Sequence, residues 1–426
     1  MLLSFRVANH GSLREPQELN FVPAYEDDRP AVTVVAIYGA NASGKSTVID
    51  AFRFFTDAVR ESQAKWLPGA PVPRRPFLLD HVSRAEPSSY AVDVLVGGVR
   101  YVYGFGVTDA GVAEEWLYAY PKARKRVLFE RDGMEITYGA TLTGERVAAE
   151  RIMRPNSLYL SAAAQTSHRL LGRIWEALAN RLRVVTDSDR HAITEAAAGA
   201  FVAEFFEELR RLGLPLGGEV LAAADLGVHG IRPAAGRNTV APREGFPEAV
   251  PETFAAAMSK PLEFVHRVGD EEFVLPVDAE SAGTKTWLNL VFRALMVVLR
   301  GFPMWVDEID VSLHPLLTAK LLSLFQDPQL NPLGAQLVFT THDAALLGTM
   351  LGEQVLRRDQ VWFVEKDAKT GASELYPLSD FKPRKGENFE RRYLAGSYGA
   401  VPLLPETAFE DMVRKFWGAH GKAVPA

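Results

Sequence analysis

The feature that most constrains how this chain folds is a short glycine-containing segment, GANASGKS at residues 39–46, which matches the pattern G-x-x-x-x-G-K-[ST]. The run before it, Val32 to Tyr38, is rich in apolar and β-branched residues and is typical of a strand buried on both faces. The segment after it carries apolar residues at helical spacing, namely Val48, Ile49, Phe52, Phe55 and Val59. This order of strand, glycine-rich loop and helix predicts a phosphate-binding loop in an α/β fold.

Each residue type in the loop has a physical reason. Glycines let the backbone curl so that its N–H groups converge on phosphate oxygens at a helix N-terminus, where the helix dipole also favours negative charge. Lys45 is expected to reach the β- and γ-phosphates, and Ser46 is expected to bind Mg²⁺. The full set of residues that we expect to contact the nucleotide here is Gly39, Ala40, Asn41, Ala42, Ser43, Gly44, Lys45, Ser46 and Thr47.

A second motif lies far along the chain, where an apolar strand, Met304 to Val306, ends in two acids. A nucleotide-bound Mg²⁺ needs a carboxylate at such a strand end, and we assign this role to Asp307. Glu308 is placed to orient or deprotonate the attacking water. An apolar run followed by two acids is common by itself, but together with the phosphate loop it predicts Mg²⁺-dependent hydrolysis of a nucleoside triphosphate.

Composition narrows the class of protein. The 426 residues are 47% apolar and 23% charged with a net charge of -6, so disordered and fibrous classes are excluded and two or three globular domains are expected. Cysteine is absent, which excludes disulfides, Cys-ligated zinc and a Cys nucleophile. The first residues lack a secretory pattern, and Arg293, Arg300 and Gly301 interrupt the longest apolar region. We therefore expect a soluble, cytoplasmic protein with no membrane partner.

The pattern along the chain predicts an α/β fold with a mixed or parallel sheet core, an antiparallel β layer and an inserted helical lobe. We place domain boundaries at 1–165, 166–260 and 261–426. Short strands with hairpin turns between Ser88 and Tyr138 predict the antiparallel layer. The remaining predicted elements are a strand at 157–160, helices at 163–182 and 194–212, a loop at 233–253, a hairpin at 262–268 and 272–277, helices at 284–299 and 315–325, and strands at 336–340 and 360–365.

Three further motifs indicate which class of nucleotidase this is. The segment Glu280 to Thr284, ESAGT, resembles the signature of ATP-binding-cassette (ABC) ATPases. Asp310, in IDVSLHP, stands in a segment that resembles their D-loop, and His342, in FTTHD, resembles their switch histidine. Alone, ESAGT would be read as a helix N-cap and His342 as a core histidine. In this order, with the phosphate loop and the acid strand, the four pieces resemble an ABC-type P-loop ATPase head.

A closer resemblance follows from the spellings LLSFRVANHGSLREPQELNF, YGANASGKS, ESAGTKTWL and DEIDVSLHP and the tail from QVWFVEKD to ERRYLAGSYGAVP. They are similar to bacterial RloA-like ATPases, relatives of the RecF, OLD and SMC proteins. The resemblance covers about half of the chain and implies an ATP-driven homodimer. In such a dimer Ser281 and Gly283 of one copy cover the γ-phosphate held by the other. It also implies ATP and Mg²⁺ as cofactors, and action in phage defence or another nucleic-acid transaction, with a separate effector protein as partner.

Some positions depart from the wider ABC pattern. Glu280, Ala282 and Thr284 replace the usual Leu, Gly and Gln. As the glutamine that couples Mg²⁺ to movement between lobes, the candidate is Gln165, although an ordinary surface or capping glutamine fits equally well. No D-x-D pattern of an OLD-type nuclease follows Glu365, and long coiled-coil arms are absent from the sequence.

Two basic clusters make nucleic acid a candidate partner. Lys122, Arg124, Lys125 and Arg126 lie in an expected hairpin turn, and a second cluster lies between Lys382 and Arg392. A solvated turn, or for the second cluster a protein contact, explains them as well. Two rival functions stay open at this stage: a RecF-like DNA-repair ATPase and a scaffold that binds ATP without hydrolysing it.

Overall fold

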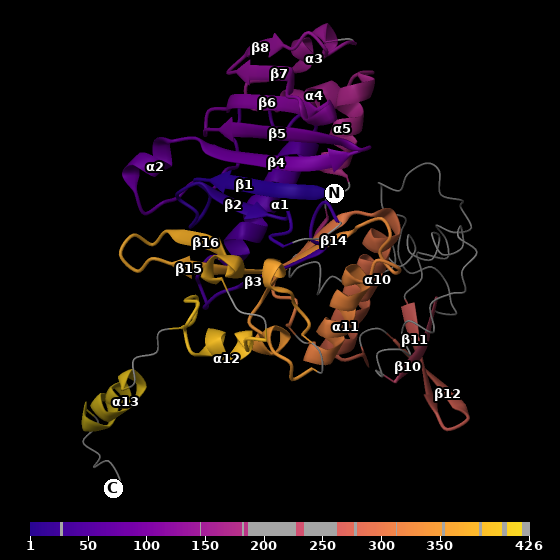
Figure 1. Ribbon diagram of the computed structural model, residues 1–426, viewed down its shortest axis with the longest axis vertical. Helices are drawn as coiled ribbons and strands as arrows, with labels where there is room; N and C mark the ends of the chain where they lie inside the picture. Colours follow the sequence, from indigo (N-terminus) through magenta and orange to yellow (C-terminus); the bar gives the residue numbers. More distant parts are fainter. Residues whose placement is uncertain are drawn as a thin grey trace.

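The computed structural model describes residues 1–25, 29–144, 146–180, 183–185, 227–233, 262–276, 279–311, 313–351, 354–382, 386–402 and 407–419. The predicted helix at 194–212 lies outside these residues, as does nearly all of the predicted loop at 233–253. The described part forms a seven-stranded sheet, a six-stranded sheet and a three-stranded sheet (Figure 1). No helix in the described part is both long and apolar enough to cross a membrane.

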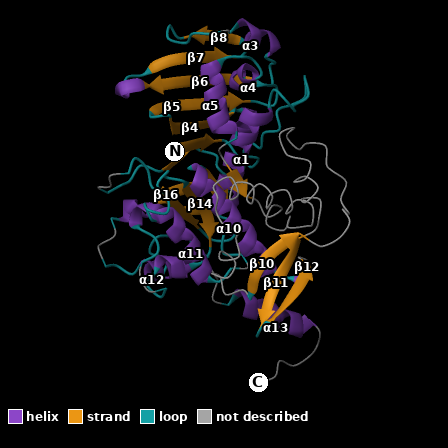
Figure 2. Cartoon of the chain, turned by 90° about the vertical axis from the view of Figure 1, so that its right-hand side faces the viewer, coloured by secondary structure: helices purple, strands orange, loops and turns teal. Residues whose placement is uncertain are grey.

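The seven-stranded sheet is antiparallel and confirms the predicted β layer, but it also includes the N-terminal strands. Its strand order is β2-β1-β4-β5-β6-β7-β8. The bounds are β1 (Leu2–Ala8), β2 (Gln17–Asn20), β4 (Ser88–Val96), β5 (Val99–Val107), β6 (Val112–Tyr120), β7 (Arg126–Asp132) and β8 (Glu135–Tyr138). Figure 2 shows helices against one face of this sheet.

The six-stranded sheet carries the nucleotide motifs, in the order β16-β15-β3-β14-β13-β9. The bounds are β3 (Val34–Tyr38), β9 (Arg183–Val185), β13 (Pro303–Val306), β14 (Gln336–Thr341), β15 (Val361–Lys366) and β16 (Ser373–Pro377). All pairs are parallel except β15 with β16. Strand β14 therefore lies between the phosphate-loop strand β3 and the acid strand β13, and the carboxyl ends of all three meet at one edge.

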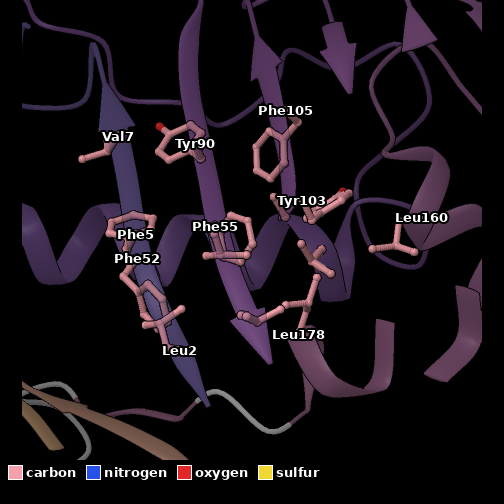
Figure 3. Close-up of a cluster of buried hydrophobic side chains, with 14 of the residues drawn as sticks. Leu2, Phe5, Val7, Phe52, Phe55, Tyr90, Tyr103, Phe105, Leu160 and Leu178 are labelled. Atoms are coloured by element: carbon pink, nitrogen blue, oxygen red, sulfur yellow. The ribbon is translucent and has the colours of Figure 1, made fainter. Parts of the chain in front are cut away.

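Helix α1 (Lys45–Glu61) is packed between the two large sheets. Figure 3 shows Phe52 and Phe55 of α1 against Phe5 of the antiparallel sheet. The ring of Phe52 lies 5.1 Å from that of Phe5 and stacks at 3.8 Å on Trp305 of β13. The helix that starts at the phosphate loop is thus fixed on both sides by aromatic contacts.

Other helices cover the second face of the six-stranded sheet. Successive residues of its strands point to opposite faces and are apolar on both, so both faces are buried. They are α10 (Ala282–Arg300), α11 (Pro315–Gln326) and α12 (Phe389–Leu394). The three-stranded sheet has the order β10-β11-β12, with β10 (Val228–Pro233), β11 (Leu262–Val268) and β12 (Glu271–Pro276). Further helices in the described part are α2 (His81–Ala85), α3 (Val147–Ile152) and α13 (Ala408–Ala419).

The predicted strand at 157–160 is wrong, because helix α4 (Tyr159–Ala164) begins there. The buried carboxylate of Glu115 accepts the backbone N–H groups of Tyr159 at 2.6 Å and Leu160 at 2.9 Å, and so satisfies the first amides of α4. Arg131, at 3.2 Å, balances its charge. The predicted helix at 163–182 is also interrupted, because α5 starts anew at Arg169 and ends at Ala179.

Candidate functional site

The phosphate loop connects β3 to α1, and its two glycines have no room for a side chain. A Cβ on Gly39 would lie 2.5 Å from both the Ser43 hydroxyl and the carbonyl oxygen of Val364. Gly44, the N-cap of α1, has φ +112°, a conformation that favours glycine. The loop geometry therefore depends on both glycines, as the sequence motif requires.

Lys45 lies inside the loop. It is 5% exposed, and its ammonium group donates to the carbonyl oxygens of Gly39 at 2.9 Å and Ala40 at 3.0 Å. Burial lowers the pKa of Lys45, and the carboxylates of Glu308 and Asp307 oppose that effect. The structure thus brings this lysine within electrostatic reach of both acids that follow β13.

The remaining loop residues divide between solvent and interior. Asn41, Ala42 and Ser46 are exposed, which leaves the Ser46 hydroxyl accessible in the first turn of α1. The Ser43 hydroxyl is buried and has no hydrogen-bond partner in the structure. Thr47 is turned toward the N-terminal turn of the chain, because Ser12 donates to its hydroxyl at 3.3 Å.

Two serines that sequence reasoning missed, Ser12 and Ser373, support the phosphate loop through hydrogen bonds. The Ser373 hydroxyl, on β16, donates to the carbonyl oxygen of Ser43 at 2.6 Å and lies 2.8 Å from the Ser12 hydroxyl. The backbone N–H of Ser373 also donates to the carbonyl oxygen of Ser12 at 2.7 Å. These residues are hundreds of positions apart in the chain, so no local motif marks them.

At the end of the acid strand, Thr340 of β14 fixes both acids. Its hydroxyl donates to Asp307 Oδ1 at 2.6 Å and accepts the backbone N–H of Glu308 at 2.6 Å. Glu308 has φ +49°, which is strained for a residue with a side chain. Strain of this kind is tolerated where surrounding bonds over-determine the backbone, and here Thr340 supplies two of them.

His342 and Asp310 adjoin the same edge. His342 Nε2 lies 4.0 Å from Glu308 Oε1, and the His342 backbone N–H is 3.4 Å from Asp310 Oδ2. Burial, followed by the charge of Lys45, lowers the pKa of His342, against the opposing effect of the acids. Asp310 Oδ1 is buried without a hydrogen-bond partner. The structure thus gathers Lys45, both strand-end acids, Asp310 and His342 around one volume.

Ser281 and Gly283 lie in the first turn of α10. The Ser281 side chain is the N-cap, accepting the backbone N–H of Thr284 at 3.0 Å, and the residue is exposed. Glu280 is tied to His266 of β11 at 2.5 Å. The Ser281 hydroxyl therefore bonds within its own helix turn and is otherwise open to solvent.

Gln165 is not brought to the phosphate loop, which corrects the assignment of this residue as a metal ligand. Helix α4 packs at the far end of α1, where the Ser161 hydroxyl accepts the backbone N–H of Gln63 at 3.2 Å. With 17 residues, α1 is about 25 Å long, so its two ends are well separated. Gln165 is exposed and caps α4. The error arose because this segment was predicted to be a strand.

Mg-ATP fits the residues at this edge. Lys45 and the loop amides would hold the phosphates, and Ser46 and Asp307 would hold Mg²⁺, which supplies charge neutralisation at the γ-phosphate when bound. Among the described residues, no group of three or more His, Asp or Glu side chains is placed to hold a metal by itself. Mg²⁺ in nucleotide sites is commonly held by one or two carboxylates together with substrate phosphates.

Comparison with known families agrees with this geometry. A family model described as "AAA domain, putative AbiEii toxin, Type IV TA system" matches residues 34–348, from the start of β3 to beyond His342. No curated protein matches the chain. The matched stretch covers most of the sequence and includes the phosphate loop, the acid strand and the histidine strand. The chain therefore belongs to this family of AAA-domain P-loop ATPases.

Proposed function

We propose that this protein is a Mg²⁺-dependent ATPase of the ABC class, in which two copies close head-to-head over two ATP molecules and thereby gate a separate effector in phage defence. Within one copy, Lys45 and Ser46 hold Mg-ATP with Asp307, and Glu308 activates the attacking water. His342 and Asp310 border the γ-phosphate. The signature residues Ser281 and Gly283 come from the second copy.

The observation that carries the dimer proposal is the position of Ser281. Within the described part of the chain its hydroxyl bonds only to Thr284, in the first turn of its own helix, and Ser281 is exposed. An exposed helix N-terminus that carries a solvent-facing serine can bind an anion. The γ-phosphate on a second copy supplies that anion, and the isologous arrangement makes two equivalent sites.

The nucleotide controls closure in this proposal. Hydrogen bonds to a charged group contribute about 1.5–3 kcal/mol each, so loss of the γ-phosphate removes the contacts that join the copies. Dimer opening then follows hydrolysis. A family description that names a toxin of a toxin–antitoxin system supports a role in which this cycle controls a second component.

The experiment combines ATP turnover with mass measurement. Glu308→Gln should lose hydrolysis and accumulate as an ATP-bound dimer, while Ser281→Arg should bind ATP and stay monomeric. The matched comparison is wild type in ADP, which should be monomeric. A monomeric Glu308→Gln protein in ATP contradicts the dimer. Turnover absent from wild type would favour the non-hydrolysing scaffold, and stimulation by duplex DNA would favour the RecF-like repair function.

A further inference from the structure

One edge of the antiparallel sheet is formed by the strand ends at the β4–β5 and β6–β7 turns. This edge lies away from the phosphate loop and carries a second concentration of positive charge. A cavity of about 480 Å³ lies there between the β4–β5 turn and the start of α5. Its wall includes Ser167, Arg169 and Arg173, with Glu176 one turn further along α5. The Arg173 guanidinium reaches the turn, since Nη2 lies 3.4 Å from the position that a Cβ on Gly97 would occupy.

The two arginines occupy positions on α5 that are electrostatically unfavourable for the helix by itself. Arg169 and Arg173 are one turn apart on one face of α5, where like charges repel by a few tenths of a kcal/mol. Arg169 also stands in the first turn, where the helix dipole disfavours cations. Neither guanidinium has an ion-pair partner among the described residues. An anion in the cavity would relieve both repulsions.

His168 also belongs to the cavity wall, with its Nε2 atom next to Gly144, 3.2 Å from the position that a Cβ there would occupy. It is 3% exposed, and its Nδ1 accepts the backbone N–H of Leu171 at 3.4 Å. Burial lowers the pKa of His168, which favours the neutral ring, and the contact from Leu171 to Nδ1 matches the form that carries its proton on Nε2. This Nε2 is buried and has no hydrogen-bond partner in the structure. The first amides of α5 are further donors without an acceptor inside the helix.

The basic β6–β7 turn lies on the same edge, two strand spacings or about 10 Å from the β4–β5 turn. Its four exposed cations are Lys122, Arg124, Lys125 and Arg126. Lys125 lies 3.6 Å from the ring centre of Tyr118, and Arg100 lies 4.9 Å from that of Tyr120. Both tyrosines stand on the sheet face opposite α1 and α5, so they lie around the strand ends from the cavity, and Arg100 there is also paired with Asp93.

We propose that this edge binds a strand of nucleic acid, with one phosphate in the cavity beside Arg169 and Arg173 and neighbouring phosphates along the β6–β7 turn. The spacing of the two basic features suits several phosphates rather than one. Repeated phosphates on a flexible strand supply this pattern, and half-buried aromatic rings offer stacking surfaces for its bases. The site is separate from the nucleotide site, which lies at the opposite end of α1.

The test is fluorescence anisotropy with a labelled single-stranded oligonucleotide, in DNA and RNA form, and with the matched duplex, at about 50 and 200 mM salt. The double variant Arg169→Ala, Arg173→Ala should bind at least tenfold more weakly, with a salt slope reduced by about 1.4 on the single strand and about 1.8 on the duplex. A control with the same charge change, Lys320→Ala with Lys369→Ala, should stay within twofold of wild type. Equal weakening of both double variants, or no binding by wild type at low salt, overturns the proposal.

Two further arms keep the result unambiguous. Ser167→Asp places a negative charge before α5, where the helix tolerates it, and should abolish binding while leaving the urea midpoint unchanged. The second arm adds ADP or inorganic phosphate to Lys45→Ala protein, whose nucleotide site is disabled. Full displacement of the strand at phosphate concentrations equal to those of the oligonucleotide would identify a small phosphorylated ligand and overturn the proposed strand.

Discussion

Single residues at the site work through one another, and Thr340 is the clearest case. Its hydroxyl joins Asp307 to the backbone of Glu308, so it sets where the metal ligand and the base stand. The motif FTTHD contains Thr340 but does not reveal this contact, because the acids stand on a different strand that pairs with β14 only in the folded chain. The phosphate loop and the two acids could be predicted from the sequence, since each motif consists of consecutive residues. Thr340, Ser12 and Ser373 could not, because their roles exist only after distant strands pair.

We expect Thr340→Val to lower kcat by roughly tenfold to a hundredfold, as loss of hydrogen bonds to a charged group and a neighbouring amide implies. Thr340→Ser keeps the hydroxyl and should stay within a few fold of wild type. The affinity for ATP should change little, because the phosphate loop is untouched. The measurement is steady-state hydrolysis over a range of ATP concentrations, and equal activity of the Val and Ser variants would rule out this role.

At the scale of elements, the sequence predicted the strands of the antiparallel layer and the helices after the phosphate loop and the signature, because their periodicity is local. It failed at α4, where the first amides are satisfied by Glu115 from a strand some 45 residues earlier. The sequence also did not predict that β1 joins the antiparallel layer, or that β14 lies between β3 and β13. Such arrangements depend on which edges are free when the sheets assemble, and not on the pattern within one segment.

Helix α1 is also held by a charged group with a testable pH dependence. Burial by itself would raise the pKa of Asp50, but the hydrogen bond and attraction of His10, with Arg53 and Arg75, lower it to about 2. A lowered carboxyl pKa stabilises the fold fully above the unfolded value of 3.8, and the effect is lost as pH falls toward 2. Asp50→Asn should therefore lose up to about 2 kcal/mol of unfolding free energy at pH 7.

Urea unfolding at two pH values checks this expectation. At pH 3 the difference between wild type and Asp50→Asn should shrink by about 1 kcal/mol. Asp57→Asn on the same helix is the matched control: burial raises the pKa of Asp57, so its replacement should not reproduce this loss at pH 7. A difference for Asp50→Asn that stays constant between the two pH values would contradict the ionic contribution.

At the scale of the whole molecule, shared sites predict that two inactive variants restore each other. Lys45→Ala keeps a working signature, and Ser281→Arg keeps a working phosphate loop. In a mixed dimer one of the two composite sites is intact. Because neither variant is expected to close with itself, every ATP-bound dimer in an equal mixture is mixed, and with one intact site of two we expect at most about half of wild-type turnover.

The complementation assay measures hydrolysis for each variant alone and for the mixture. Each variant alone should be inactive. Doubling the concentration of Lys45→Ala in the absence of the other variant should not restore hydrolysis. If Ser281→Arg alone hydrolyses ATP at the wild-type rate, each site is complete within one copy and the shared-site model fails.

The bond from Ser373 to Ser43 has a further consequence, for the order in which the molecule is made. The two residues are 330 positions apart, so the loop emerges from the ribosome long before the serine that supports it. At about 5–20 residues per second, that gap lasts roughly 17–66 s. Strands β14 and β15, on either side of β3, also arrive late in this interval. A nascent chain thus carries its phosphate loop for most of its synthesis without the surroundings that shape it, and nucleotide binding is among the last properties it acquires.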